Sequence, residues 1–348
     1  MNGIGFSVIR QAVARVLVGI AATVVLLSLL LTMLWRDREK LDDIPFPPPP
    51  APTGDEIVVT ATWFGVSMLL IDDGETQILI DGFISRPRLI DIVARRPVDS
   101  DAATINFILN EHRMRRLAAI IPVHTHFDHA MDIGAIANRS SASILGSASS
   151  VQVGRGAGVP DDQLVTVEDN AEYTFGNFTV RFVKSLHAPV GWNGNVPLAG
   201  TIDEPLSLPA PITAFREGGS YSILISHPDG SALVQGSAGV RDDVLADLDV
   251  DTVFLGVGLV EGLGRDYVER YWLQTVTATG AKTVIPIHFD DYTRPFGHVE
   301  LMPRVLDNFL KTARWLGELR DNWDSDTALF LPQFGVPFVL YPQPEPDA

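Results

Sequence analysis

The stretch HTHFDHA, His124 to Ala130, dominates the interpretation of this 348-residue sequence. It places three of the chain's eight histidines and one aspartate within six consecutive positions. A lone histidine is usually a core or surface residue, but this spacing arises by chance in about one of several thousand comparable sequences. Neutral imidazole and carboxylate are ligands that suit Zn²⁺, Mn²⁺ or Fe²⁺. The stretch therefore predicts a metal site.

The motif follows a run of residues that is typical of a buried strand. LAAIIPV, residues 117–123, is apolar and leads directly into His124. In an extended chain His124 and His126 point to the same face, whereas Asp128 and His129 follow in a loop. We therefore expect a site at a strand end, where side chains from several strands meet at one rim of the scaffold.

Hairpins, with helices between groups of strands, predict an α+β fold with two mixed sheets and outer helices. The first strand-like run is expected to form two strands around a turn at Asp73-Gly74. Apolar strand-like runs occupy 61–83, 117–123, 170–189, 221–237, 250–258 and 282–289. Helical spacing marks 105–117, 265–280 and 301–320. We find no internal repeats.

Composition excludes several classes of protein. The net charge of −17 argues against a nucleic-acid partner, because such partners require a basic surface. The absence of cysteine excludes disulfides and thiolate zinc sites. The 46% of hydrophobic residues fits a chain with a substantial folded core.

The N-terminal region predicts a single membrane anchor. Val16 to Leu34 contains no charged residue and is long enough for one transmembrane helix. It lacks the small-residue cleavage site of a signal peptide, so an uncleaved anchor is favoured over a removed one. Lysine and arginine counts slightly favour a cytoplasmic domain. A short basic leader instead commonly exports the domain behind it, and we expect an extracytoplasmic domain.

The proline-rich stretch after the anchor predicts a spacer. Six of the eight positions from Pro45 to Pro52 are proline, which favours extended polyproline II over an SH3-type ligand beside a membrane. We expect the folded domain to begin near Asp55. The expected organisation is a leader at 1–15, an anchor at 16–35, a charged and proline-rich linker at 36–54 and a hydrolase domain at 55–348.

HTHFDH resembles the H-x-H-x-D-H signature of the metallo-β-lactamase superfamily, and the resemblance extends over about 56–296. WFGVSMLLIDDGETQILIDGF, residues 63–83, is similar to the opening hairpin of the lactonase-like and N-acyl-phosphatidylethanolamine phospholipase D-like branch. The resemblance implies an αββα sandwich with metals at one edge of the sheets. The segments SLHAP, VQGSAGV and TVIPIHF match those that carry the remaining metal-site residues of the family.

Carried over by position, the resemblance implies two metal sites. His124, His126 and His187 would bind the first metal. Asp128, His129 and His288 would bind the second. The implied cofactor is Zn²⁺, with two ions of which the second is weaker, and Mn²⁺ or Fe²⁺ as alternatives.

Two positions depart from the family pattern. Ser237 stands where the family has a bridging aspartate, and a neutral hydroxyl offsets the repulsion between two cations poorly. The second metal should therefore bind more weakly, although one active two-zinc β-lactamase subclass has a similar ligand set. Val66 stands where the lactonase-like branch often has histidine, which weakens transfer of that branch's substrates.

The implied chemistry is hydrolysis of an ester, lactone, amide or phosphodiester by a metal-bound hydroxide. Asp128 is expected to orient that hydroxide as the catalytic carboxylate. The Gly/Pro-rich segment 190–220 is long enough for a lid or an irregular surface loop, and Trp192 is its candidate pocket residue. Arg294 and His298 are further candidates for a pocket that takes a small-molecule or lipid-like substrate.

Two other functions fit the same residues. One is a β-lactamase-like amidase, which requires export to meet its substrate. The other is a degenerate metal-binding interaction module that carries out no turnover. The sequence does not indicate an oligomeric state.

Overall fold

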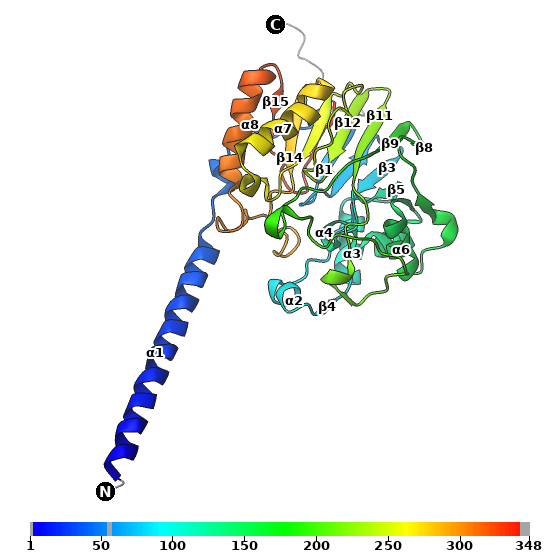
Figure 1. Ribbon diagram of the computed structural model, residues 1–348. Coiled ribbons are helices and arrows are strands. Elements are labelled where there is room, and N and C mark those ends of the chain that lie inside the picture. Colours follow the sequence, from blue (N-terminus) through cyan, green and yellow to red (C-terminus); the bar gives the residue numbers. More distant parts are fainter. Residues whose placement is uncertain (1–2, 54–57, 342–348) are drawn as a thin grey trace.

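Two mixed sheets stacked face to face form the centre of the protein (Figure 1). The computed structural model describes residues 3–53 and 58–341. The first sheet has the order β16 (Pro337–Val339), β1 (Thr60–Trp63), β2 (Leu69–Asp72), β3 (Gln77–Ile80), β5 (Leu117–Ile121), β6 (Ser143–Gly146) and β7 (Leu164–Thr166). The second has the order β15 (Ala328–Leu329), β14 (Thr283–Ile287), β13 (Thr252–Gly256), β12 (Gly230–Gln235), β11 (Tyr221–His227), β9 (Phe178–Lys184) and β8 (Glu172–Phe175).

Helices cover the outer faces of both sheets, so the predicted αββα sandwich is confirmed (Figure 1). The helices are α2 (Leu89–Val93), α3 (Ala102–Glu111), α4 (Phe127–Ala130), α5 (Ile133–Ser140), α6 (Ala148–Gly156), α7 (Arg265–Thr275) and α8 (Phe309–Trp323). A small pair of strands, β4 (Pro97–Val98) and β10 (Ala210–Pro211), lies apart from the sandwich. The larger apolar core includes Trp63, Phe182 and Trp272, and a second core includes Ile105 and Ile133.

Strand direction brings distant segments to one edge of the sandwich. β12, β13 and β14 pair in parallel, and β9 and β12 are both antiparallel to β11. The carboxyl ends of these four strands therefore point the same way. In the other sheet β3 and β5 are also parallel. Residues that follow these six strand ends make up the site described below.

The opening strands and the last helix differ from their predictions. The first run forms three strands, β1 to β3, because Gly65 and Val66 adopt positive φ angles of 87° and 50° and turn the chain before β2. The last helix begins at Phe309 instead of Leu301. Pro303 does not support an earlier helix, and the Asn308 side chain accepts a hydrogen bond from the Lys311 backbone to cap the first turn.

A single long helix, α1 (Gly3–Arg36), projects from the domain (Figure 1). The predicted leader is therefore continuous with the predicted span. Residues Val13–Arg36 are apolar and long enough to cross a membrane, and none of this window is buried against the domain. This helix is the one candidate membrane span among the described residues.

Much of the predicted linker, between residues 37 and 50, packs on the domain. Arg38 forms an ion pair of 2.7 Å with the buried Asp291, and the backbone of Leu310 donates to Glu39 over 2.8 Å. The carbonyls of Pro47 and Pro50 accept hydrogen bonds from Leu331 and Val339. Proline lacks an N–H but keeps its carbonyl, so an extended proline run can still border a sheet edge. The predicted domain start at Asp55 lies outside the described residues.

Candidate metal centre

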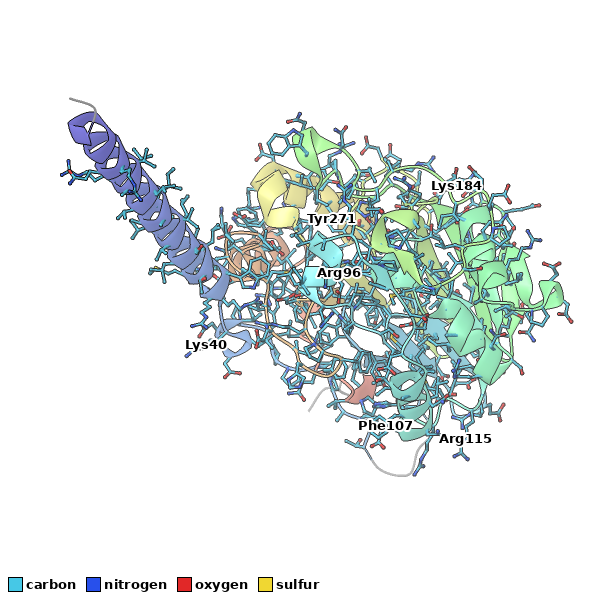
Figure 2. All side chains as sticks on the ribbon, turned by 90° about the horizontal axis from the view of Figure 1, so that it is seen from below. Lys40, Arg96, Phe107, Arg115, Lys184 and Tyr271 are labelled. Atoms are coloured by element: carbon cyan, nitrogen blue, oxygen red, sulfur yellow. The ribbon has the colours of Figure 1, made fainter. Side chains whose placement is uncertain are left out.

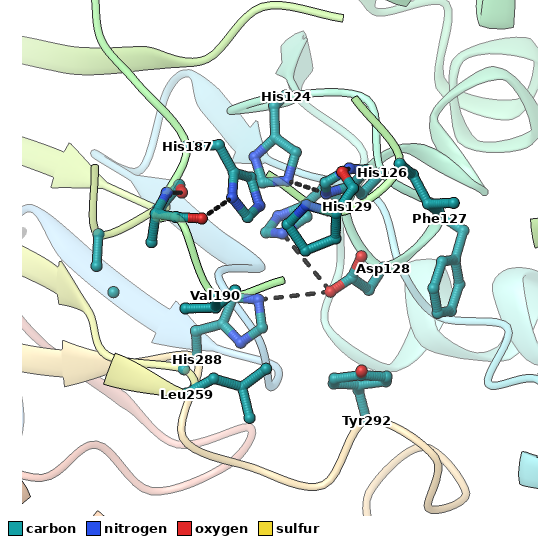
Figure 3. A pocket seen from close by; sticks show the side chains of 18 residues that line it. His124, His126, Phe127, Asp128, His129, His187, Val190, Leu259, His288 and Tyr292 are labelled. Atoms are coloured by element: carbon teal, nitrogen blue, oxygen red, sulfur yellow. Dashed lines mark hydrogen bonds and ion pairs between the residues drawn. The ribbon is translucent and has the colours of Figure 1, made fainter. Parts of the chain in front are cut away.

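Three histidines from two strand ends form the first half of the site (Figure 3). His124 and His126 follow β5, and His187 follows β9. One ring nitrogen of each lies within 4.8 Å of the others. The Nε2 atom of His124 and the Nδ1 atom of His126 are 3.0 Å apart. The structure therefore brings together the three residues predicted to hold the first metal.

The second half is formed by an aspartate and two histidines. Asp128 and His129 lie in the short helix α4 instead of the predicted loop, and His288 follows β14. The Oδ2 atom of Asp128 lies 3.4 Å from Nε2 of His288 and 3.7 Å from Nε2 of His129 (Figure 3). These three ligand atoms also lie within 4.8 Å of one another. The six predicted ligands thus form two adjoining triads, defined here as the histidine triad and the Asp128 triad.

Hydrogen bonds outside the site assign the tautomers of three histidines. His126 Nε2 donates to the Pro197 carbonyl over 2.9 Å, and His187 Nδ1 donates to the Ala188 carbonyl over 2.7 Å. His129 Nδ1 donates to Oδ2 of Asp81 over 2.7 Å. Each ring then presents its other nitrogen, as a bare lone pair, to the site.

Burial keeps the histidine triad neutral. It lowers the pKa of His126 and of His187 to about 4, and it holds the pKa of His124 well below its usual range. In His129 burial opposes the charged form, but Asp81 and Asp128 outweigh it and raise the pKa. Burial also acts on Asp128, yet His129 and His288 lower its pKa.

The residues present fit divalent metal ions. Six buried or half-buried donors converge, and within each triad the ligand atoms lie within 4.8 Å of one another. Asp128 supplies a negative charge within the second group. A nitrogen-rich triad beside a mixed nitrogen and oxygen triad is the donor chemistry of zinc or a similar first-row ion.

Asp81 supports the site and was missed by reasoning from the sequence. It follows β3 with a φ of 59°, is fully buried, and accepts hydrogen bonds from His129 and from the Val123 backbone. Ser67 Oγ lies 3.2 Å from the same ring nitrogen of His129. The available signal was an acidic residue directly after a buried strand, in the segment LIDGF.

Replacement of Asp81 by asparagine is expected to weaken binding of the second metal about tenfold to a hundredfold. A neutral amide stabilises the proton on His129 Nδ1 less than the Asp81 carboxylate does. The ring is then held less firmly in the tautomer that presents Nε2 to the metal. Titration of the apo protein with Zn²⁺ by calorimetry measures both ions. The first ion should bind as in the wild type, and equal weakening of both would contradict a role through His129.

Backbone strain accompanies the last histidine ligand. His288 has a φ of 62°, and its N–H donates to the Val66 carbonyl over 2.8 Å. The Val66 N–H in turn donates to Asp290, whose other oxygen lies 3.5 Å from Arg86. Positive φ in a residue with a side chain is costly and persists where neighbours enforce it. These contacts hold His288 in place.

Gly258 leaves the space that His288 needs. A Cβ atom at this position would lie 2.7 Å from His288 Nδ1 and 2.8 Å from its carbonyl oxygen. We expect Gly258→Ala to displace His288 and to weaken the second metal by about tenfold to a hundredfold. Gly262→Ala is the matched control, because its Cβ would meet nothing within 4 Å. Metal titration of both variants checks this, and equal behaviour would refute it.

Ser237 lies in the pocket and contacts a neighbour of a ligand. Its Oγ accepts a hydrogen bond of 3.1 Å from the backbone N–H of Ala188, next to His187. The hydroxyl therefore helps to hold the loop that carries this histidine. The bridging role of this position stays a prediction.

The pocket over the triads has mainly apolar walls. Its lining beyond the six ligands is Phe127, Ala188, Val190, Pro197, Leu198, Gly236, Ser237, Ala238, Gly256, Gly258, Leu259 and Tyr292. Val190, Pro197 and Leu198 come from the long segment after His187, which therefore lines part of the pocket, and its role as a lid stays a prediction. The segment contributes its short apolar side chains.

The three other candidate pocket residues do not line it. Trp192 is 86% exposed, because the turn Trp192–Gly194 points its ring to solvent. Arg294 forms a 2.7 Å ion pair with Glu300, and His298 is exposed in the same loop. The direction of a loop side chain depends on its tertiary contacts, which the spacing of residues in the sequence does not predict.

Comparisons with known proteins agree with this geometry. The chain is 22% identical over 233 residues to a protein of Pyrobaculum islandicum described as a UPF0173 metal-dependent hydrolase, covering 66% of this chain and 84% of the relative. A Pyrobaculum aerophilum protein of the same description is 24% identical over 233 residues, with the same coverage. No family model matches the chain.

The sandwich and the H-x-H-x-D-H stretch are those of the metallo-β-lactamase fold. The two relatives are described as metal-dependent hydrolases, which agrees with the resemblance to the metallo-β-lactamase superfamily. The predicted class of enzyme, a metal-dependent hydrolase, is confirmed by the two relatives. Its placement in the lactonase-like or phospholipase D-like branch stays a prediction.

Solved structures similar to this metallo-β-lactamase-fold protein are distant in sequence. The metallo-β-lactamase fold protein YhfI from Bacillus subtilis has a TM-score of 0.49 and 13% identity, covering 81% of this chain and 99% of that one. An isothiocyanate hydrolase from Delia radicum gut bacteria has a TM-score of 0.49 and 15% identity, and the match covers 81% of this chain and 100% of that one.

Proposed function

We propose that this protein is a membrane-anchored hydrolase that cleaves an ester, lactone or amide bearing an apolar group. The observation that carries this proposal is the convergence of the two triads beneath a pocket with apolar walls. Zn²⁺ is the proposed metal, with two ions of which the second is weaker. Bound divalent ions make water reactive near neutral pH and polarise a substrate oxygen.

The chain's own residues orient the reactants. Asp128 stays ionised near neutral pH, because His129 and His288 outweigh its burial and lower its pKa. Its carboxylate can accept a hydrogen bond from the attacking water and align it. Tyr292 lines the same pocket, and burial together with Asp128 raises the pKa of its phenol. The protonated phenol can donate to a substrate oxygen.

The pocket walls favour a carbonyl substrate over a phosphodiester. Within the described part of the chain, the residues that line the pocket include no lysine or arginine. A phosphoryl substrate usually needs such a cation for recognition. Val190, Leu198 and Leu259 instead offer contact to an acyl chain or another apolar group. A small-molecule or lipid-like substrate fits this surface.

Metal analysis and a substrate panel test the proposal. The full-length protein in detergent should bind about two equivalents of Zn²⁺, one tightly, and hydrolyse fluorogenic acyl esters or lactones faster than bis-p-nitrophenyl phosphate. Nitrocefin in the same panel tests a β-lactamase-like amidase. Absence of bound metal with His124 and His126 intact would refute the proposal, and metal binding without any turnover would favour the interaction module.

We also propose that α1 anchors the protein and that the domain lies outside the cytoplasm. The exposed apolar surface of Val13–Arg36 supports the anchor. Cell membranes should retain the protein after an alkaline carbonate wash and release it with detergent. Protease added to intact spheroplasts should digest the domain, and protection of the domain would reverse the orientation.

A further inference from the structure

Four exposed apolar side chains lie in two segments, and each segment places one of them in a cleft with the end of α1. Ile90 and Val93 of α2 are 52% and 70% exposed, and Val305 and Leu306 are 56% and 51% exposed. We call these four residues the apolar patch. A surface cleft joins the patch to the last turns of α1 and is lined by Leu31, Thr32, Leu34, Trp35, Arg36, Val93 and Val305. The apolar surface of the anchor thus continues onto the domain.

Arginines surround the patch in a strongly acidic chain. Residues 86–97, RPRLIDIVARRP, contain four arginines and one acidic residue, whereas the whole chain carries −17. The side chains of Arg88 and Arg96 are 75% and 57% exposed, and both pair with the same carboxylate, Asp91. One carboxylate cannot neutralise two guanidinium groups, so this surface keeps a positive excess.

The anchor is tied to the segment that carries half of the patch. Glu39 forms an ion pair of 3.2 Å with Arg304, which precedes Val305, and Arg38 pairs with Asp291. In Figure 1, α1 leaves towards the lower side and α2 lies at the lower edge of the domain. Figure 2 views the domain from that side, with Arg96 within the outline of the domain and Lys40 near the end of α1.

We infer that the apolar patch docks on the surface of the bilayer that α1 crosses. The four apolar side chains enter the interface, and the arginines contact anionic lipid headgroups. This inference rests on the proposed anchoring by α1. A bilayer is the favoured occupant because the cleft makes the patch continuous with the candidate membrane span α1 and because the exposed Arg88 and Arg96 share a single carboxylate beside it.

Contacts link both segments of the patch to residues around the metal centre. Asp307, just after the patch, accepts a hydrogen bond from the backbone of Leu259, which lines the pocket. Arg86, just before α2, pairs with Asp290, two residues after His288, and Asp290 accepts a hydrogen bond from Val66, whose carbonyl accepts from the His288 backbone. One patch segment therefore contacts a residue of the pocket wall, and the other contacts the backbone that holds His288. A lipid-like substrate would reach the pocket from the docked side.

Single-cysteine labelling of the full-length chain tests the docking. The chain has no cysteine, so Val93→Cys and Val305→Cys each create one labelling site. Each variant carries an environment-sensitive fluorophore in nanodiscs with one copy per disc and 30% anionic lipid, roughly the charge of an anionic leaflet. Quenching by lipids spin-labelled near the headgroup is measured. Trp323→Cys, at the far end of α8 and 53% exposed before replacement, is the matched control.

We expect lipid quenching at 93 and 305 to exceed that at 323 by at least about twofold. Double replacement of Arg88 and Arg96 by glutamine should reduce the quenching in anionic discs, while Arg320→Gln on α8 should not. Equal quenching at all three positions would overturn the inference. So would shielding of the patch that appears only with two copies per disc, which would indicate a second copy as the occupant.

A further label separates this inference from the anchoring on which it rests. Leu26→Cys, in the middle of the apolar helix, should be quenched by lipids labelled deep in the acyl chains. Quenching at 26 without excess quenching at 93 and 305 shows an anchored but undocked domain. Absence of quenching at position 26 would contradict both the anchoring by α1 and the docking of the patch. Neither result bears on hydrolysis, which is measured with the substrate panel.

Discussion

The His126→Ala variant is expected to lose the first metal and to lower kcat/KM by at least about a thousandfold, or about 4 kcal/mol. His126 contributes its Nδ1 atom to the histidine triad and lies 3.0 Å from His124 Nε2. Removal of this ring leaves two nitrogens, too few to hold a tetrahedral ion tightly. Metal content by mass spectrometry and steady-state kinetics on the best substrate measure the two losses.

His298→Ala is the control for this variant. The structure places His298 exposed and outside the pocket, so its removal should leave metal content and kcat/KM unchanged. Protons do not compete with the first metal for the histidine triad near neutral pH, because burial lowers the pKa of His126 and of His187 to about 4. Protons should therefore compete for this triad only as the pH falls towards 4. Wild-type rates in His126→Ala would contradict hydrolysis at this centre.

The Asp128→Asn variant is expected to keep the first metal and lower kcat by about a hundredfold to a thousandfold. The amide keeps the shape of the side chain but loses the charge that faces His129 and His288, at 3.7 Å and 3.4 Å. It also no longer accepts a hydrogen bond from water with a carboxylate's strength. The second metal should bind more weakly as well.

Saturating metal separates the two roles of Asp128. If this residue only binds the second ion, excess Zn²⁺ should restore kcat in Asp128→Asn. If it also orients water, kcat should remain low when both ions are bound, and we expect this second result. Full recovery would show that the carboxylate acts as a ligand alone.

Much of the site was predictable from the sequence because its parts are local. The apolar run 117–123 and the spacing of His124, His126, Asp128 and His129 lie within one short segment. Strand and loop geometry within such a segment follows from the chain itself. His187 and His288 came instead from the resemblance to a family, and the structure places both at the same sheet edge.

Other features depended on contacts between distant segments. Asp81, the Pro197 carbonyl and the Ala188 carbonyl assign the histidine tautomers, and hydropathy does not indicate such partners. The predicted spacer packs on the domain because Arg38 and Glu39 find partners more than 250 residues away. The proline content of this linker predicted that it is stiff, but not where it lies on the domain.

The sequence by itself determined the ligand types in HTHFDHA, the two mixed sheets with outer helices and the apolar N-terminal helix. Each follows from local spacing or periodicity, which the chain carries without reference to its fold. Only the tertiary structure decided that Val190 and Leu198, instead of Trp192, cover the pocket. Only it placed the apolar patch beside α1. Side-chain direction in loops is set by long-range packing, and no short segment encodes that packing.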